Sequence, residues 1–146
     1  MRTEGFGPVS ALAAMLFSAI KNDDKNGNAK IKKSTAAKQS GRGRLPEVGE
    51  LLSFKSAVKE MSTADLPIFF FEHAKYPLRG CMEKYNGGEI AVLVGSEGGF
   101  SNEEAAFAEE NGLLCASLGP RILRCETAPV AAISAIMYAA GEMEII

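Results

Sequence analysis

The residues that could carry chemistry are concentrated in two glycine-containing segments near the end of the chain. One spans residues 95–99 and reads Gly-Ser-Glu-Gly-Gly, and the other spans residues 118–124 and reads Leu-Gly-Pro-Arg-Ile-Leu-Arg. Because glycine lacks a Cβ and adopts positive φ readily, such loops let backbone atoms approach a ligand closely. We expect this freedom at Gly98 and Gly99, so replacing Gly98 or Gly119 should be more damaging than replacing Ser96. The pattern predicts a ligand site formed mainly by main-chain atoms.

Several polar side chains near these loops have two interpretations each. Glu97 could contact a substrate, but a carboxylate that accepts loop N–H bonds is favoured. Glu72 follows a strand, where open α/β sheets bind ligands, yet helix capping or solvation is favoured. His73 is the only histidine, and a hydrogen-bonded surface position is favoured over a general base. Nothing in the sequence activates Cys125 as a nucleophile.

Regular elements on either side of the loops should position them. Residues 90–94 are an apolar, β-branched run, typical of a strand buried on both faces. Ser101 and Glu104 have the spacing of a capping box, and the helix that they begin should end at 111–112, Asn-Gly. Residues 113–118 predict a second strand before the second loop.

The last helix is expected to be apolar nearly throughout. Thr127 is the predicted N-cap, Pro129 falls in the first turn, and Gly141 ends the element. A helix with so few polar residues must be buried, either in the core or against another subunit. The loop pair therefore lies between elements whose buried faces can hold it in place.

The earlier part of the chain alternates between strand-like and helix-like segments. Residues 9–20 predict a strand or a buried helix, too short to span a bilayer. The remaining predictions are a polar loop at 22–28, a basic helix at 31–40, a helix at 52–61 capped by Ser53, a short buried strand at 68–71, and a loop at 75–88 with a helical turn at 81–85. This alternation indicates an α/β layered domain with a mainly parallel sheet.

Composition limits the classes of function. A length of 146 residues suits one domain, and a net charge of −2 with a pI near 5.5 argues against a general nucleic-acid coat protein. Basic residues do gather locally, although a solvated surface is an equally good interpretation of Lys25, Lys30, Lys32, Lys33, Lys38, Arg42 and Arg44. Three cysteines without Cys-x-x-Cys spacing and a single histidine argue against a metal site such as zinc. The odd number of cysteines favours a reducing cytoplasm.

Three motifs together resemble a known family. Residues 94–104 read VGSEGGFSNEE, residues 118–132 read LGPRILRCETAPVAA, and residues 37–42 read AKQSGR with Pro46 following. They are similar to the signature of the SPOUT-class RNA methyltransferases, and most closely to the ribosomal RNA small subunit methyltransferase E family. The resemblance covers roughly residues 30–141, while residues 1–30 match poorly. Ser96 and Cys125 depart from the family's usual Pro and Thr.

The resemblance implies a SPOUT-type fold with a C-terminal trefoil knot, a rare exception to the rule against knots. It also implies a cytoplasmic homodimer that uses S-adenosylmethionine, without a metal, to methylate N3 of a uridine in small-subunit ribosomal RNA. Full-length relatives carry an N-terminal barrel-like RNA-binding domain, for which residues 1–146 leave no room. We therefore expect one SPOUT domain that is truncated or divergent at its start.

By the same resemblance, site residues carry over to matching positions. Arg124 is the catalytic candidate, as a cation that stabilises the uridine anion, and Glu126 could accept a proton or instead form an ion pair or cap. The RNA-binding candidates are Gln39, Arg42, Arg44 and Arg121. The cofactor-binding candidates are Leu93, Val94, Gly95, Glu97, Gly98, Gly99, Leu118, Gly119, Ile122, Leu123, Arg124, Thr127 and Ala128.

Two other functions stay open at this point. One is a truncated SPOUT domain that folds, dimerises and binds cofactor with little or no activity. The other is a nucleotide-phosphate protein that uses the loop at Gly95, which is disfavoured because neither G-x-x-x-x-G-K-[ST] nor G-x-G-x-x-G is present.

Overall fold

The computed structural model describes residues 12–15, for their backbone only, and residues 52–145. In the described part of the chain a five-stranded sheet has the order β1-β4-β2-β5-β3, and every neighbouring pair is parallel. The strands are β1 (Leu12–Met15), β2 (Leu66–Phe70), β3 (Tyr76–Pro77), β4 (Ile90–Leu93) and β5 (Leu114–Ser117). The predicted parallel α/β fold is confirmed.

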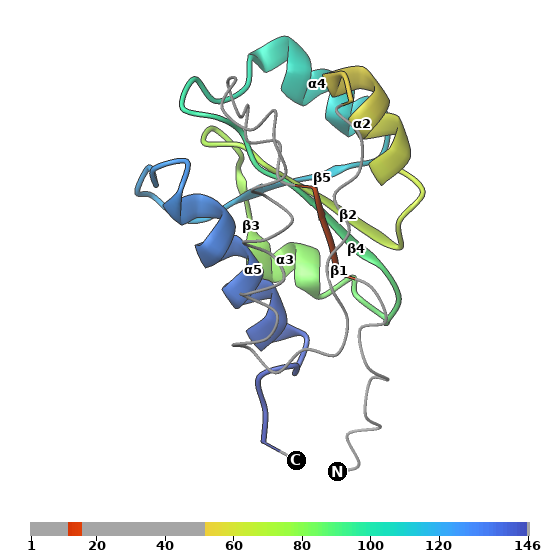
Figure 1. The fold of residues 1–146 in the computed structure, drawn as a ribbon, viewed down its shortest axis with the longest axis vertical. Helices are drawn as coiled ribbons and strands as arrows, with labels where there is room; N and C mark the ends of the chain where they lie inside the picture. Colours follow the sequence, from red (N-terminus) through yellow and green to blue (C-terminus); the bar gives the residue numbers. More distant parts are fainter. Residues whose placement is uncertain (1–11, 16–51, 146) are drawn as a thin grey trace, which may run out of the picture. The chain divides into compact units, whose positions relative to one another are not determined.

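Helices cover both faces of this sheet (Figure 1). The helices α2 (Phe54–Met61) and α4 (Asn102–Glu110) pack on one face, and α3 (Leu78–Met82) and α5 (Thr127–Ala139) pack on the other. Successive residues of a strand point to opposite faces. Accordingly Ile90 and Val92 of β4 enter one core cluster, while Ala91 and Leu93 enter the other. The whole of β4 is buried, as its apolar sequence predicts.

Side-chain caps begin two of the helices as predicted. The Ser53 hydroxyl accepts the Ser56 N–H at 3.2 Å and begins α2. At α4, the Glu104 N–H donates to the Ser101 hydroxyl at 3.1 Å, and the Ser101 N–H donates to the Glu104 carboxylate at 2.8 Å. This reciprocal capping box satisfies two N–H groups that would otherwise lack partners.

The start of α5 differs from the prediction. Glu126 is the N-cap residue and makes no side-chain cap bond, and Thr127 is already the first helical residue. The backbone turns earlier than expected because the Arg124 carbonyl accepts the N–H groups of both Thr127 and Ala128 at 2.9 Å. The helix α5 was expected to be buried either in the core or against another subunit. The core of this chain buries only Ala132 and Ile136 of the helix.

Two short elements around residue 78 were not located correctly from the sequence. The helix α3 covers Leu78–Met82, three residues before the predicted turn at 81–85, and β3 was not predicted. Both residues of β3 are exposed at the edge of the sheet, so they lack the apolar pattern that marks a buried strand.

The segment 9–20, predicted as a strand or a buried helix, contains the strand β1. The predicted polar loop at 22–28 and basic helix at 31–40 lie outside the described residues. None of the helices in the described ranges has the length and apolar character that a membrane span requires.

Candidate functional site

The two glycine loops lie at one edge of the sheet. Parallel strands place their carboxyl ends at the same edge, where open α/β sheets bind ligands. The strand β2 lies between β4 and β5, so the loops after β4 and β5 flank the residues that follow β2. All three segments line a single cavity of about 240 Å³.

Most of the predicted cofactor residues line this cavity. They are Val94, Gly95, Glu97, Gly98, Gly99, Leu118, Gly119, Ile122, Leu123 and Ala128. Three others do not: Leu93 is fully buried in the core, and Arg124 and Thr127 are exposed at the start of α5. The structure therefore brings both loops together at one cavity, which is the arrangement that a shared ligand requires.

Residues at the end of β2 also line the cavity. Phe70, Phe71 and Glu72 lie between the two loops there, and of these three the sequence indicated only Glu72 as a possible ligand contact. The sequence predicts the three phenylalanines 69–71 as core residues. Phe69 is fully buried as expected, whereas Phe70 and Phe71 also line the cavity. The signal that could have found them is their position at the carboxyl end of a buried strand.

The glycines of the first loop have different structural needs. Gly99 has φ 64°, in the left-handed region that favours glycine. At Gly95 an added Cβ would lie 2.9 Å from the Phe100 ring. Gly98 is not among the positive-φ glycines, and an added Cβ would meet no atom within 4 Å. Of the two glycines expected to have this freedom, only Gly99 uses positive φ, and Gly95 and Gly99 are the constrained positions of the loop.

An aromatic cluster anchors the first loop beneath the cavity. The Phe100 ring centroid lies 4.5 Å from that of Phe69 and 5.6 Å from that of Phe54. Within the loop, the Gly99 N–H donates to the Ser96 carbonyl at 2.9 Å. Packing against a buried strand and a helix thus fixes the turn that Gly95 and Gly99 allow.

Hydrogen bonds of Ser117 shape the second loop. The Gly119 N–H donates to the Ser117 hydroxyl at 3.1 Å, and that hydroxyl lies 3.2 Å from the Gly119 carbonyl, to which it can donate. Gly119 has φ 109°, so a side chain there would be strained. The chain can then continue as a loop past Ile122, which is 80% exposed, to α5.

One side-chain contact joins the two loops. The Cys125 thiol lies 4.0 Å from a Glu97 carboxylate oxygen. Partial burial, followed by the charges of Glu126 and Glu97, raises the pKa of the Cys125 thiol, which agrees with the expectation that it is not an activated nucleophile. Glu97, Cys125 and Glu126 each offer one atom that could bind a metal ion, and these three atoms lie within 4.8 Å of one another. The expected absence of a metal therefore stays a prediction.

Acidic groups stand on two sides of the cavity. Glu97 lines it from the first loop, and Glu72 from the end of β2. A Glu72 oxygen lies 3.3 Å from Nε2 of His73, whose side chain is 70% exposed. The predicted surface position of His73 is confirmed, and its partner there is Glu72. Arg121, predicted to bind RNA, also lines the cavity, whereas Gln39, Arg42 and Arg44 lie outside the described residues.

A parallel α/β domain with a cavity at the carboxyl ends of adjacent strands belongs to the class of open-sheet α/β proteins, which bind ligands at this edge of the sheet. Within that class, the model of the RNA methyltransferase domain family matches residues 11–137. The chain belongs to this family, and the resemblance found in its motifs is confirmed.

Individual relatives agree with this assignment. Ribosomal RNA small subunit methyltransferase E of Bacillus subtilis (strain 168) is 33% identical over 135 residues, which are 83% of this chain and 52% of the relative. The protein of the same name from Buchnera aphidicola subsp. Schizaphis graminum is 33% identical over 109 residues, with 75% of this chain and 44% of the relative covered. The chain thus spans about half the length of the curated relatives it matches.

Solved structures show the same fold. A protein from Legionella pneumophila, described as a methyltransferase in complex with S-adenosylmethionine, aligns with a TM-score of 0.65 and 29% identity over 82% of this chain and 52% of its own. Ribosomal RNA small subunit methyltransferase E from Neisseria gonorrhoeae, bound to S-adenosylmethionine, aligns with a TM-score of 0.64 and 28% identity. This alignment covers 80% of this chain and 52% of the other.

Proposed function

We propose that this chain is an S-adenosylmethionine-dependent methyltransferase of ribosomal RNA, and that its methyl acceptor is N3 of a uridine in the small-subunit RNA. The observation that carries the proposal is the single cavity formed by both glycine loops in a chain of the RNA methyltransferase domain family. Relatives crystallised with S-adenosylmethionine support the choice of cofactor.

The lining of the cavity fits this cofactor. Leu118, Ile122 and Leu123 offer apolar surface for the adenine. Backbone groups of the glycine loops can approach its polar edge, because glycine itself carries no side chain. The carboxylates of Glu72 and Glu97 place negative charge beside the cavity, which favours a ligand that bears a sulfonium cation. We assign the cofactor to the predicted residues that line this cavity.

When bound, the cofactor supplies an activated methyl group, and transfer to N3 requires the two reacting atoms to be held in line. The N3 proton must also leave, and a nearby cation would stabilise the anion that forms. Arg124 remains the proposed electrostatic group, although its side chain is not part of the cavity lining. Arg121, which is part of it, is assigned to position the base or a phosphate, together with Gln39, Arg42 and Arg44.

A homodimer, a C-terminal trefoil knot and a cytoplasmic location belong to the same proposal. Support for dimerisation comes from α5, where Val130 is 65% and Tyr138 76% exposed. A second copy would cover these apolar side chains, which otherwise face water. Support for the knot is the family resemblance itself.

A second candidate keeps the fold and the cofactor but not the turnover. The match covers only about half the length of its relatives, and the family resemblance implies that the rest includes an N-terminal RNA-binding domain. In this case the domain dimerises and binds S-adenosylmethionine, but holds RNA too weakly to methylate it.

Transfer of radiolabelled methyl groups separates the two candidates. Purified chain is incubated with labelled S-adenosylmethionine and small ribosomal subunits from a strain that lacks the uridine N3 modification. We expect label in the RNA at N3 of one uridine. Binding of S-adenosylhomocysteine without any transfer favours the second candidate, and preferential binding of ATP would contradict both.

A further inference from the structure

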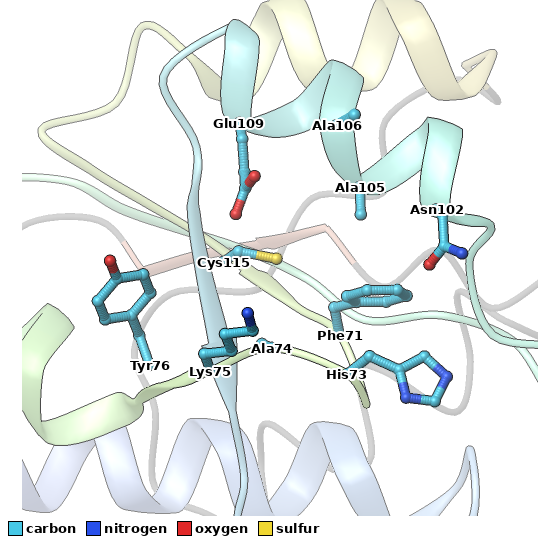
Figure 2. Close-up of a pocket in the computed structure, with 10 residues that line it drawn as sticks. All are labelled: Phe71, His73, Ala74, Lys75, Tyr76, Asn102, Ala105, Ala106, Glu109 and Cys115. Atoms are coloured by element: carbon cyan, nitrogen blue, oxygen red, sulfur yellow. The ribbon is translucent and has the colours of Figure 1, made fainter.

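A second cavity, of about 330 Å³, lies beside α4 and is not used by any role assigned above. Figure 2 shows the residues that line it: Phe71, His73, Ala74, Lys75, Tyr76, Asn102, Ala105, Ala106, Glu109 and Cys115. They come from α4, from β5, from the segment that links β2 to β3 and from the first residue of β3. Phe71 lines both this cavity and the one between the glycine loops, so ligands in the two cavities would be neighbours.

One side of this cavity is aromatic and basic. The rings of Phe71 and His73 meet edge to face, with centroids 5.4 Å apart and an interplanar angle of 85°. Tyr76 is 68% exposed on the edge strand, and its side chain lies beside that of Lys75 (Figure 2). Exposed aromatic rings with an adjacent cation are the groups on which unpaired bases stack while their phosphates are held.

The opposite side carries a hydrogen-bond acceptor. Glu109 points from α4 toward the middle of the cavity, and Lys75 points toward it from the other wall (Figure 2). The side chains of these two described residues form no ion pair with each other. The Glu109 carboxylate accepts a hydrogen bond from the Cys115 thiol, and its other lone pairs can still accept one from a ligand. Asn102, on the same helix, adds an amide that can donate and accept.

The floor of the cavity is neutral. Cys115 is buried, and desolvation, followed by the charge of Glu109, raises the pKa of its thiol to about 11. The thiol therefore stays protonated at neutral pH, and Glu109 is the only carboxylate in the described lining. A ligand here would meet one anionic acceptor, one ammonium group and several ring edges.

We propose that this cavity receives an unpaired nucleotide of the RNA, next to the nucleotide that is methylated, and that it prefers a base with an exocyclic amino group. This inference rests on the proposed function. The base stacks against Tyr76 or His73, its amino group donates to the Glu109 carboxylate, and Lys75 contacts a phosphate. Uracil presents carbonyl oxygens where cytosine and adenine have an amino group, and a carboxylate repels these oxygens.

Short single-stranded RNAs provide the test. Two fluorescent pentanucleotides with a central uridine, one with cytidines and one with uridines on both sides of it, are titrated with the full chain. We expect tighter binding of the cytidine-flanked RNA by about tenfold, the size of one good base-edge contact. Glu109→Gln should reduce this preference to roughly twofold or less, whereas Glu110→Gln, on the exposed neighbouring residue outside the cavity, should keep it.

A second pair of variants tests the phosphate contact. Lys75→Ala should weaken binding of both RNAs by a similar factor and lower the salt dependence, because a phosphate contact carries no sequence information. Lys59→Ala, an exposed lysine of α2, should do neither. Asn102→Ala serves as a further variant if Glu109→Gln fails to fold, and it too should reduce the preference.

Titration with S-adenosylhomocysteine distinguishes failure of this inference from failure of the proposed function. If the chain binds S-adenosylhomocysteine and both RNAs, but without a preference that Glu109→Gln or Asn102→Ala alters, the nucleotide subsite is wrong and the proposed function stands. A chain that binds neither S-adenosylhomocysteine nor RNA would overturn both.

Discussion

Gly99 and Gly119 hold left-handed backbone in the two loops, with φ of 64° and 109°. Residues with a Cβ are strained by about 1–3 kcal/mol in such conformations. Gly98 directly precedes Gly99 but lacks this constraint, and it has open space where a Cβ would stand. The three glycines therefore differ in tolerance although they look alike in the sequence.

Gly119→Ala should lower the free energy of unfolding by about 1 kcal/mol or more and weaken S-adenosylhomocysteine binding, because the second loop must change its path. The matched variant Gly98→Ala should leave the free energy of unfolding within about 0.5 kcal/mol of the original chain. Denaturant unfolding and calorimetric titration measure the two effects. Equal losses of stability in both variants would contradict the role of positive φ at Gly119.

The buried thiol of Cys115 makes a second prediction, on pH. Its pKa is raised from 9.0 to about 11 by burial and then by Glu109, so between these values the unfolded chain loses the proton while the folded chain keeps it. The folded state then binds more protons, and the free energy of unfolding must fall as pH rises. One unit of pKa shift corresponds to about 1.4 kcal/mol, so the loss from this group approaches roughly 2–3 kcal/mol.

Urea unfolding at pH 8, 9, 10 and 11 measures that loss. Cys115→Ala should be less stable at pH 8 but should lose less on further alkalisation than the original chain does. Cys125→Ala, which removes a half-exposed thiol, should keep most of the original slope. Parallel slopes for Cys115→Ala and the original chain would show that other groups account for the loss.

At the scale of the element, the capping box of α4 connects stability to the first loop. Ser101 directly follows the anchored residue Phe100, and its hydroxyl and N–H both bond to Glu104. Ser101→Ala should lower the free energy of unfolding by about 1 kcal/mol, the usual cost of a lost N-cap. It should also weaken S-adenosylhomocysteine binding, since the loop that lines the cavity ends at this cap.

Ser134→Ala is the matched control for this variant. Ser134 lies exposed within α5, far from any helix start, and alanine favours helix interiors. Removal of the Ser134 hydroxyl should leave the free energy of unfolding unchanged or slightly higher in the same denaturant titration. If Ser101→Ala and Ser134→Ala behave alike, the cap does not hold the loop.

For the whole molecule, the exposed apolar side chains of α5 predict self-association. Val130→Glu or Tyr138→Glu would place a charge in an interface between two copies, where it would lack a partner. We expect the original chain to sediment as a dimer and each variant as a folded monomer. Lys59→Glu on α2 should remain dimeric, and a monomeric original chain would contradict the proposed homodimer.

The sequence by itself determined the local elements around the loops. The capping box at Ser101, the cap at Ser53 and the buried strand at 90–94 follow from bonds and burial patterns within a few residues, and the structure has all three. Both glycine loops were likewise located, because turns, caps and apolar runs are short-range features.

The tertiary structure alone decided which segments meet. The strand order places β2 between β4 and β5, and this brings Phe70, Phe71 and Glu72 into the cavity. The sequence could not show this order, because strand pairing depends on contacts between residues far apart in the chain. It also could not show that Gly98 lacks positive φ or that α5 leaves Val130 and Tyr138 exposed, because both depend on how each element packs against its neighbours.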